Sequence, residues 1–595
     1  MKVSPQAESP GRPQEEYEAR LGRGNQERER WEKLFIPIGN ARLALVLIGL
    51  VIVWRGSWWV VAPIAGFIGL VIWHEQVMRK RDIARRRISF YQRGLARLAG
   101  AWSEAGSQGE RFRDPEHVFA EDLDLFGRGS LFQLLSLART GSGEATLARW
   151  LKAPATREEA ADRQDAIREL RDKLDLREDI AILGYDIAAG VHERELAHWG
   201  QSAGAPFVRF ARPIAIVLSL VAIGTFLFAM VGVGRWAFFL MTLLVEFGFI
   251  YSMRHGVGHV MAGVETPARD LHILALLTAR LEKEQFTSPR LAKLRALLDL
   301  EGEPASKRIA QLQRLIELLH SANNQLVAVI APVVLWREHL TMAIEDWRVK
   351  WGPAISTWLE AVGELEALGS LAAFHYERPE ANFPELLDSS APLLDATGIK
   401  HVLLDPQKAV ANDVALGADS QLWIVSGSNM SGKSTLMRAV GLGAVLAWTG
   451  APVPAERFRI SRLSVGASLR TVDSVLDGRS RFYAEIRRLR QVVDTAKAGP
   501  TLFLLDELLS GTNSHDRRIG AEALVRGLVA RGAIGFVTTH DLALASLADS
   551  IPGARNVHFE DQIEGTEIHF DYKLRNGVVT RSNALELMRA VGLEV

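Results

Sequence analysis

A glycine-rich loop after a short apolar run is the part of this chain with the clearest chemistry. The run Leu422 to Val425 leads into Gly-Ser-Asn-Met-Ser-Gly-Lys-Ser-Thr at residues 427–435. In a loop of this spacing, successive backbone N–H groups surround nucleotide phosphates, the lysine reaches the same oxygens, and the next serine can bind Mg²⁺. An apolar strand before the loop and a helix after it are the context that this motif requires. The pattern therefore predicts an ATP and Mg²⁺ site rather than a chance glycine-rich turn.

Two further strand ends complete the predicted site. The apolar run Thr501 to Leu505 ends in Asp506 and Glu507 and predicts a Walker B strand, with Asp506 and Ser434 at the metal and Glu507 activating water. The run Ile534 to Val537 leads to His540, which we expect at the same edge as a catalytic switch residue, because ligands of such sheets bind at strand carboxyl ends. The predicted cofactor-binding residues are Gly427, Ser428, Asn429, Met430, Ser431, Gly432, Lys433, Ser434 and Thr435, and Lys433 is also counted as catalytic.

Composition frames this site. The chain has 595 residues, of which 48% are hydrophobic and 24% charged, so a mainly disordered protein is excluded. It contains no cysteine, which rules out disulfides, thiolate metal sites and cysteine nucleophiles. Lys plus Arg equal Asp plus Glu at 70 each, so the net charge gives no general argument for nucleic-acid binding. Any contact with DNA must therefore come from a local patch.

The apolar residues are concentrated in two pairs of segments. Leu34 to Trp54 and Ser57 to Trp73 are joined by a tight turn, as are Pro213 to Val233 and Trp236 to Met253. Each segment is near the length needed to cross about 30 Å of hydrocarbon, and tryptophans fall at the ends. We predict two transmembrane hairpins, against the alternative of buried helix pairs in a soluble protein. Glu246 lies well inside a predicted span, where a functional and a packing role are both open.

Basic flanks set the predicted orientation. Positive residues precede and follow each hairpin, whereas each turn carries a single arginine. By the positive-inside rule both chain ends are cytoplasmic, and no secretory signal is expected in the charged segment Met1 to Lys33. We therefore expect a multi-pass protein of the cytoplasmic (inner) membrane, with its ATPase domain in the cytoplasm.

Between the hairpins and the nucleotide motifs the periodicity is helical. Apolar residues recur at spacings of three and four in Asp270 to Glu284, Arg308 to Ala322, Leu340 to Val349 and Ile355 to Phe374. Three prolines then indicate a linker near Phe383 to Lys400.

The motifs resemble those of the MutS mismatch-repair ATPases. The likeness rests on Asn-Met within the loop, Asn412-Asp413 before its strand, Asp477 to Glu485 with Ser480, Gly511-Thr512 after the Walker B strand, and Thr539-His540. Leu125 to Leu170 is similar to the start of the family's helical core, and Glu364 to Ala372 to its last lever helix. The resemblance implies a homodimer through the ATPase domains, in which Ser480 completes the partner's nucleotide site. It also implies that DNA is bound.

The chain departs from the family in three places. A tail and a hairpin precede Leu125, where the family carries its mismatch-reading domain, so direct mismatch readout is not expected. Leu509-Ser510 replace the usual Gly-Arg after the Walker B strand, and the chain stops at Val595 without the family's further dimerising helices.

These observations predict a multidomain protein with a C-terminal α/β P-loop ABC-type ATPase domain, an α-helical core and lever domain, and four transmembrane helices in two hairpins. The expected divisions are a charged tail (1–33), hairpin 1 (34–73), a helical core-like region (74–206), hairpin 2 (207–254), a helical lever region (255–382) and the ATPase domain (383–595). The function expected is a membrane-anchored MutS-like ATPase that switches a dimer and acts on DNA. An ATP-driven membrane scaffold that binds no DNA is the alternative. A transporter of the ABC type is disfavoured, because no Leu-Ser-Gly-Gly-Gln precedes the Walker B strand.

Overall fold

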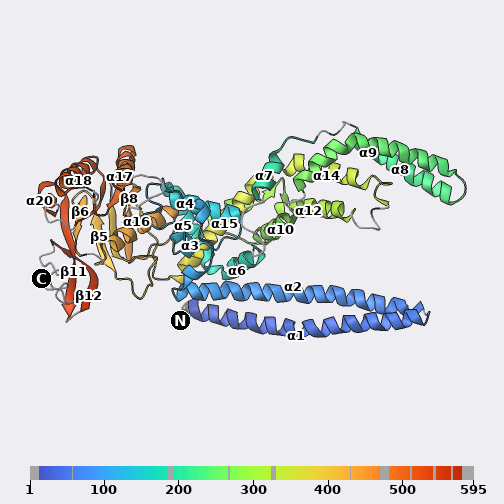
Figure 1. The fold of residues 1–595 in the computed structure, drawn as a ribbon, viewed down its shortest axis with the longest axis horizontal. Helices are drawn as coiled ribbons and strands as arrows, with labels where there is room; N and C mark the ends of the chain where they lie inside the picture. Colours follow the sequence, from blue (N-terminus) through green and yellow to red (C-terminus); the bar gives the residue numbers. More distant parts are fainter. Residues whose placement is uncertain are drawn as a thin grey trace, which may run out of the picture. The chain divides into compact units, whose positions relative to one another are not determined.

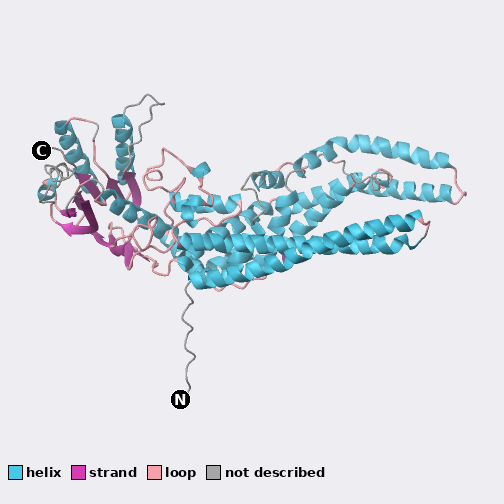
Figure 2. Cartoon of the chain, turned by 60° about the horizontal axis from the view of Figure 1, so that its bottom comes forward, coloured by secondary structure: helices cyan, strands magenta, loops and turns pink. Residues whose placement is uncertain are grey.

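The computed structural model describes most of the chain. The described residues are 13–56, 58–184, 193–205, 207, 210–264, 268–322, 328, 330–428, 431–469, 481–509, 512–539, 545–564 and 567–578. They form two compact units: unit 1 comprises Met1–Leu137, Leu147–Glu178 and Leu368–Val595, and unit 2 comprises Ala138–Thr146 and Asp179–Ala367. Nearly all strands gather in the C-terminal part, while the remainder is helical (Figure 2).

Unit 1 contains a six-stranded sheet in the order β12-β11-β6-β10-β9-β8. Its strands are β6 (Leu422–Ser426), β8 (Ser464–Ser468), β9 (Thr501–Leu505), β10 (Ile534–Thr539), β11 (Ala554–Glu564) and β12 (Glu567–Asn576). All neighbours pair in parallel except β12, which runs antiparallel to β11 at the edge. The predicted α/β domain is thus present, and its central strands β6, β9 and β10 are fully buried.

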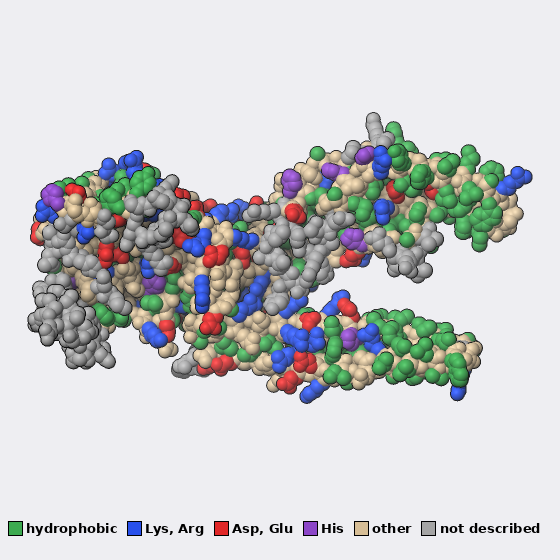
Figure 3. Space-filling view, in the orientation of Figure 1, with side chains coloured by type: hydrophobic (Ala, Val, Ile, Leu, Met, Phe, Trp, Pro, Cys, Tyr) green, Lys and Arg blue, Asp and Glu red, His purple; other side chains and the backbone are tan. Residues whose placement is uncertain are grey.

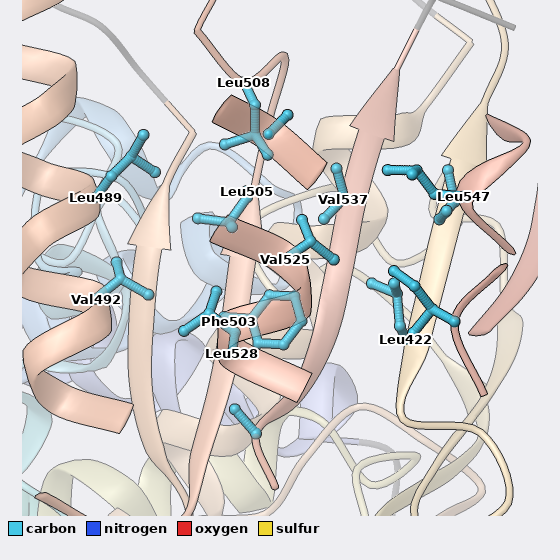
Figure 4. Close-up of a cluster of buried hydrophobic side chains, with 14 of the residues drawn as sticks. Leu422, Leu489, Val492, Phe503, Leu505, Leu508, Val525, Leu528, Val537 and Leu547 are labelled. Carbon is cyan, nitrogen blue, oxygen red and sulfur yellow. The ribbon is translucent and has the colours of Figure 1, made fainter. Parts of the chain in front are cut away.

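Helices cover both faces of this sheet. Phe503 and Leu505 lie in one apolar cluster with side chains of α17 (Arg481–Ala498) and α18 (Ser514–Val529) (Figure 4). Leu504, between them on β9, lies instead against Gly441 of α16 (Lys433–Thr449). Successive side chains of a strand point to opposite faces, so this alternation places α16 on the face opposite α17 and α18. The short α20 (Leu547–Ser550) joins the α17–α18 side.

A second, four-stranded sheet occupies the stretch predicted to be a linker. Its order is β3-β7-β4-β5, with β3 (Glu385–Leu386), β4 (Leu394–Ile399), β5 (Asn412–Leu416) and β7 (Arg457–Ile460). The linker interpretation was wrong for residues 394–399. Prolines flank this strand without interrupting it, and Leu394, Ala396 and Ile399 are buried.

The other elements of unit 1 are helical. The N-terminal hairpin consists of α1 (Pro13–Trp54) and α2 (Val61–Leu98), and α1 continues unbroken through residue 33 (Figure 1). The short α3 (Leu131–Leu135) follows, with α5 (Arg157–Asp172) beyond it; α4 (Gly141–Lys152), α6 (Leu174–Leu183) and α15 (Ala354–Glu377) each contribute residues to both units.

Unit 2 is built from helices whose positions agree with the predicted periodicity. They are α7 (Glu193–Gln201), α8 (Ala211–Met230), α9 (Trp236–Val264), α10 (Ala268–Glu282), α11 (Pro289–Ala296), α12 (Ala305–Ser321) and α14 (Trp336–Trp351), with a two-residue hairpin of β1 (Asp299–Leu300) and β2 (Glu303–Pro304). The helices predicted from residues 270, 308, 340 and 355 onward correspond to α10, α12, α14 and α15.

Four helical segments are long and apolar enough to cross a membrane, judged by length and composition within the described residues. They are Pro13–Trp54, Trp58–Leu98, Ala211–Met230 and Trp236–Gly263. Their apolar side chains are largely exposed, with Trp54 at 87% and Leu244 at 71%.

Candidate nucleotide site at the strand ends

The loop between β6 and α16 turns sharply before the helix begins. Gly427 has φ +145° and Gly432 φ +109°, conformations that residues with a Cβ rarely adopt. A Cβ on Gly427 would also lie 2.9 Å from the Ser431 Oγ atom. Both glycines are therefore required by backbone geometry. Asn429 and Met430, which we predicted to bind the cofactor, lie outside the described residues.

Lys433 is buried at the start of α16 and turns back over the loop. Its Nζ atom donates to the carbonyl oxygens of Gly427 and Ser428, both at 2.7 Å, and the residue is only 5% exposed. The ammonium is therefore held above the loop backbone by two neutral acceptors. This arrangement suits an anionic ligand, because phosphate oxygens are stronger acceptors for an ammonium group than carbonyls are.

Asp506 lies beside Ser434, as the motif spacing predicts. The Ser434 hydroxyl donates to one Asp506 carboxylate oxygen at 2.5 Å, and the Thr538 hydroxyl donates to the other. The strand order accounts for this meeting, because β10 lies between β6 and β9 and the three carboxyl ends coincide. One hydroxyl and one carboxylate within hydrogen-bonding distance form an oxygen donor pair of the kind that Mg²⁺ takes.

Glu507 follows on an exposed, strained turn. Its φ of +46° lies in the left-handed region, which is uncommon for a residue with a side chain. The backbone N–H of Glu507 donates to the Thr538 hydroxyl at 3.0 Å, which holds this conformation. Such strain is concentrated at functional positions, where surrounding contacts maintain it. Sequence reasoning did not assign a role to Thr538, although its position at the end of β10 could have indicated one.

The segment Asp477 to Glu485, which lies between β8 and β9 in the chain, is only partly described. Glu485 of α17, within the resembling segment, is 3% exposed and accepts a hydrogen bond from the Leu509 N–H at 2.5 Å. Leu509 itself has φ +56°. Ser480 and His540, predicted as cofactor-binding and catalytic residues, lie outside the described residues.

A cavity of about 420 Å³ adjoins the loop. Its lining includes Gly432 and Thr435, together with His401, Phe559 and Tyr572. Burial, and secondarily the positive charge of Arg438, lower the pKa of His401 to about 4, so its ring is neutral at neutral pH. The cavity is therefore a partly aromatic space next to a phosphate-type loop, and Lys408 adds a cationic side chain to its lining. Sequence reasoning missed His401 and Phe559, because they come from segments distant in the chain.

Asn412, at the start of β5, lines this cavity and forms hydrogen bonds with the edge strand β12. Its side-chain amide donates to the Tyr572 carbonyl at 3.0 Å, and its oxygen accepts from the Leu574 N–H at 2.8 Å. These two bonds fix β12 against the start of β5, and so position the Tyr572 ring near Gly432.

Comparison with known proteins agrees with the motif analysis. Residues 423–594 match the family model MutS domain V. The chain is 34% identical over 246 residues to a DNA mismatch repair protein MutS of Natronomonas pharaonis, a match that covers 39% of this chain and 27% of that protein. The matched part thus spans about a quarter of the length of that curated relative. These matches support a MutS-family protein, and the C-terminal α/β domain is similar to MutS domain V, an ATPase-type domain.

Proposed function

We propose that this protein is a membrane-anchored MutS-like ATPase that uses ATP binding and hydrolysis to switch a dimer acting on DNA. The observation that carries the proposal is the junction of three strand ends, where Lys433, Ser434, Asp506 and Glu507 meet. This arrangement suits phosphoryl transfer, in which the protein mainly positions the reacting groups and stabilises the charge on the phosphate.

The residues present fit ATP with Mg²⁺. Lys433 would hold the phosphates, Ser434 and Asp506 would hold the metal, and the cavity with Phe559 and Tyr572 would take the base. Bound Mg²⁺ would supply neutralisation of phosphate charge. Glu507 is exposed at the edge of the site, where its carboxylate can orient water and take up its proton.

Two variants test the chemistry. Glu507→Gln should retain ATP binding and lose nearly all hydrolysis, because only the proton acceptor is removed. Lys433→Ala should weaken ATP binding itself, because the ammonium that faces the phosphates is lost. Nucleotide-binding and turnover assays separate the two effects, and normal hydrolysis by the Gln variant would show that the base is misassigned.

Membrane anchoring is supported by the four apolar helices, and the N-terminal hairpin is attached to α15 within unit 1. Its polar ends, the foot of the hairpin, pack on the last turn of α15, directly before the ATPase domain. Arg97 of α2 donates to Glu377 from Nε at 2.7 Å and from Nη2 at 2.5 Å, and the hydroxyl of Tyr17 of α1 donates to the same carboxylate at 3.1 Å. A movement of the last turn of α15 would therefore be transmitted to the hairpin through these hydrogen bonds. Reporter fusions after Arg87 and Val595 should both report cytoplasm.

The dimer and DNA parts of the proposal rest on the similarity to the MutS family. Mixing Lys433→Ala with Ser480→Ala subunits should restore about one working site per heterodimer, because both defects then fall in one composite site. DNA binding should weaken steeply with salt and show little preference for a mismatch. Filter-binding titrations at two salt concentrations measure both properties, and a complete absence of DNA binding would favour the scaffold alternative.

A further inference from the structure

A set of exposed cations surrounds the N-terminal hairpin where its sequence changes from charged to apolar. This basic collar consists of Arg30 and Lys33 of α1 and Arg79, Lys80 and Arg85 of α2, all exposed. Exposed apolar side chains follow directly, including Ile36 at 67% and Ile72 at 56%. Figure 3 shows the blue side chains gathered on α1 and α2 next to a green apolar section.

The collar is not neutralised by its acidic neighbours. Residues 27–33 and 74–87 carry nine Lys or Arg against five Asp or Glu. Arg79 pairs with Glu75 at 3.2 Å and Arg85 with Glu32 at 3.1 Å. Arg30 and Lys80 instead lie against the Trp31 ring, 5.6 and 4.6 Å from its centroid, and among the described residues neither they nor Lys33 has an acidic partner.

Helix geometry places the collar at a fixed distance from the hairpin turn. At about 1.5 Å per residue, α1 rises about 35 Å from Trp31 to Trp54, and the second arm about 33 Å from Trp58 to Lys80. Both lengths match a hydrocarbon layer of about 30 Å plus part of its interfaces. Trp54, Trp58 and Trp59, which are 87%, 72% and 60% exposed, would then lie at one interface and the collar at the other.

We propose that the basic collar binds the phosphate groups of anionic phospholipids in the leaflet that faces the ATPase domain; this inference rests on the proposed membrane anchoring. Exposed lysine and arginine side chains beside an apolar surface match a lipid, whose headgroup is anionic and whose chains are apolar. Duplex DNA offers the same phosphates but leaves the adjoining apolar side chains without a partner. The chemistry of the surface therefore favours a lipid over a nucleic acid.

The test compares lipid selectivity in nanodiscs that contain the full chain. Spin-labelled phosphatidylglycerol and spin-labelled phosphatidylcholine are each added in small amounts to a phosphatidylcholine bilayer, and the motionally restricted fraction is measured. The wild type should restrict phosphatidylglycerol severalfold more, and about 0.5 M salt should remove most of the difference. Arg30→Gln combined with Lys33→Gln and Lys80→Gln should bring the ratio close to one. The matched control, Lys293→Gln with Lys307→Gln and Arg314→Gln, removes the same charge from exposed sites on α11 and α12 and should leave the ratio unchanged.

Other results of these measurements would refute either lipid binding by the collar or membrane anchoring. A ratio of one in the wild type, or an unchanged ratio in the collar variant, refutes lipid binding by the collar. A protein that alkaline carbonate extracts from bilayers refutes anchoring itself, whereas an integrated protein without selectivity refutes only the collar. A loss of duplex binding by the collar variant in filter assays, with lipid selectivity intact, assigns the collar to DNA.

Discussion

Helix α15 carries two buried carboxylates with contrasting surroundings, one in each compact unit. Glu377, in unit 1, is 8% exposed and receives its hydrogen bonds from the Arg97 guanidinium and the Tyr17 hydroxyl. Glu366, in unit 2, is 4% exposed and receives its bonds from neutral groups: the Thr140 hydroxyl at 2.5 Å and the N–H groups of Thr140 and Arg139 at 3.1 and 3.2 Å. Glu377 is thus paired with a cation, whereas these three contacts of Glu366 are hydrogen bonds from neutral groups.

The difference shows how the same residue type serves two purposes. Burial raises the pKa of Glu366 to about 7, although the bonds from Thr140 and Arg139 partly oppose the shift. Burial and the nearby Glu377 charge raise the pKa of Tyr17, so its phenol stays protonated as a donor. In unit 1, Glu377 is therefore held in an ion pair with Arg97 and by a hydrogen bond from Tyr17. In unit 2, the Glu366 carboxylate can change its charge near neutral pH.

The largest effect is expected from Arg97→Ala. Removing one partner of a buried ion pair leaves an uncompensated charge at Glu377 and should cost about 3–5 kcal/mol in unit 1. Since the chain has no cysteine, a single cysteine at buried Ala373 reports local opening through its labelling rate. Arg113→Ala is the control, because Arg113 pairs with Glu121 at 2.7 Å with its side chain 46% exposed, and should cost about 0–1 kcal/mol. Equal effects of the two variants would remove the distinction drawn for Glu377.

Unit 2 should lose stability as the pH rises from about 4.5 to about 7. The folded pKa of Glu366 lies above its ordinary value of 4.5, so the folded state holds more protons in this window. Its contribution is complete below pH 4.5 and is lost as the pH passes through 7, a change of about 3 kcal/mol. A cysteine at buried Ala361 reports this change when its labelling rate is normalised to that of the urea-unfolded chain at the same pH. Glu366→Gln should flatten the dependence, and an unchanged slope would show that another group titrates.

Two glycine substitutions should each lower the stability of one unit and leave the other unit unchanged. An added Cβ would lie 2.5 Å from the Tyr17 ring at Gly94 and 2.3 Å from a Glu366 carboxylate oxygen at Gly143. Each alanine variant should therefore cost about 1–3 kcal/mol through overpacking. We expect Gly94→Ala to accelerate labelling at Ala373 only, and Gly143→Ala at Ala361 only. Gly369→Ala, whose Cβ meets nothing within 4 Å, is the control and should not destabilise either unit. Joint opening of both units in either variant would argue against their independence.

The smallest effect is expected from Tyr17→Phe. The ring would remain packed between Tyr91 and Tyr376, whose centroids lie 5.5 and 5.6 Å away. Only the hydroxyl bond to Glu377 would be lost, at a cost of about 1 kcal/mol by the same labelling measurement at Ala373. A cost as large as that of Arg97→Ala would mean that Tyr17, rather than the ion pair, holds the foot of the hairpin.

Local patterns were sufficient to predict several parts of the fold. The turns at Gly427 and Gly432, the strands leading to Asp506 and Thr539, and helices α10, α12, α14 and α15 follow from spacing and periodicity, which neighbouring residues determine. Proline signals misled the prediction at β4, because a strand in a small sheet can lie between prolines. The membrane topology, the partner subunit's contribution to the site and the binding of DNA stay predictions.

The sequence by itself determined which groups are available: a phosphate-type loop, carboxylates at strand ends and apolar segments of membrane length. Only the tertiary structure decided which of them meet. Thr538 joins Asp506 because β10 lies between β6 and β9, and Tyr17 reaches Glu377 across 360 positions of the chain. The sequence of α15 alone does not reveal that Glu366 meets neutral donors whereas Glu377 meets a guanidinium group. The physical reason is that the charge state of a buried carboxylate depends on burial and on distant partners, and no local pattern encodes either.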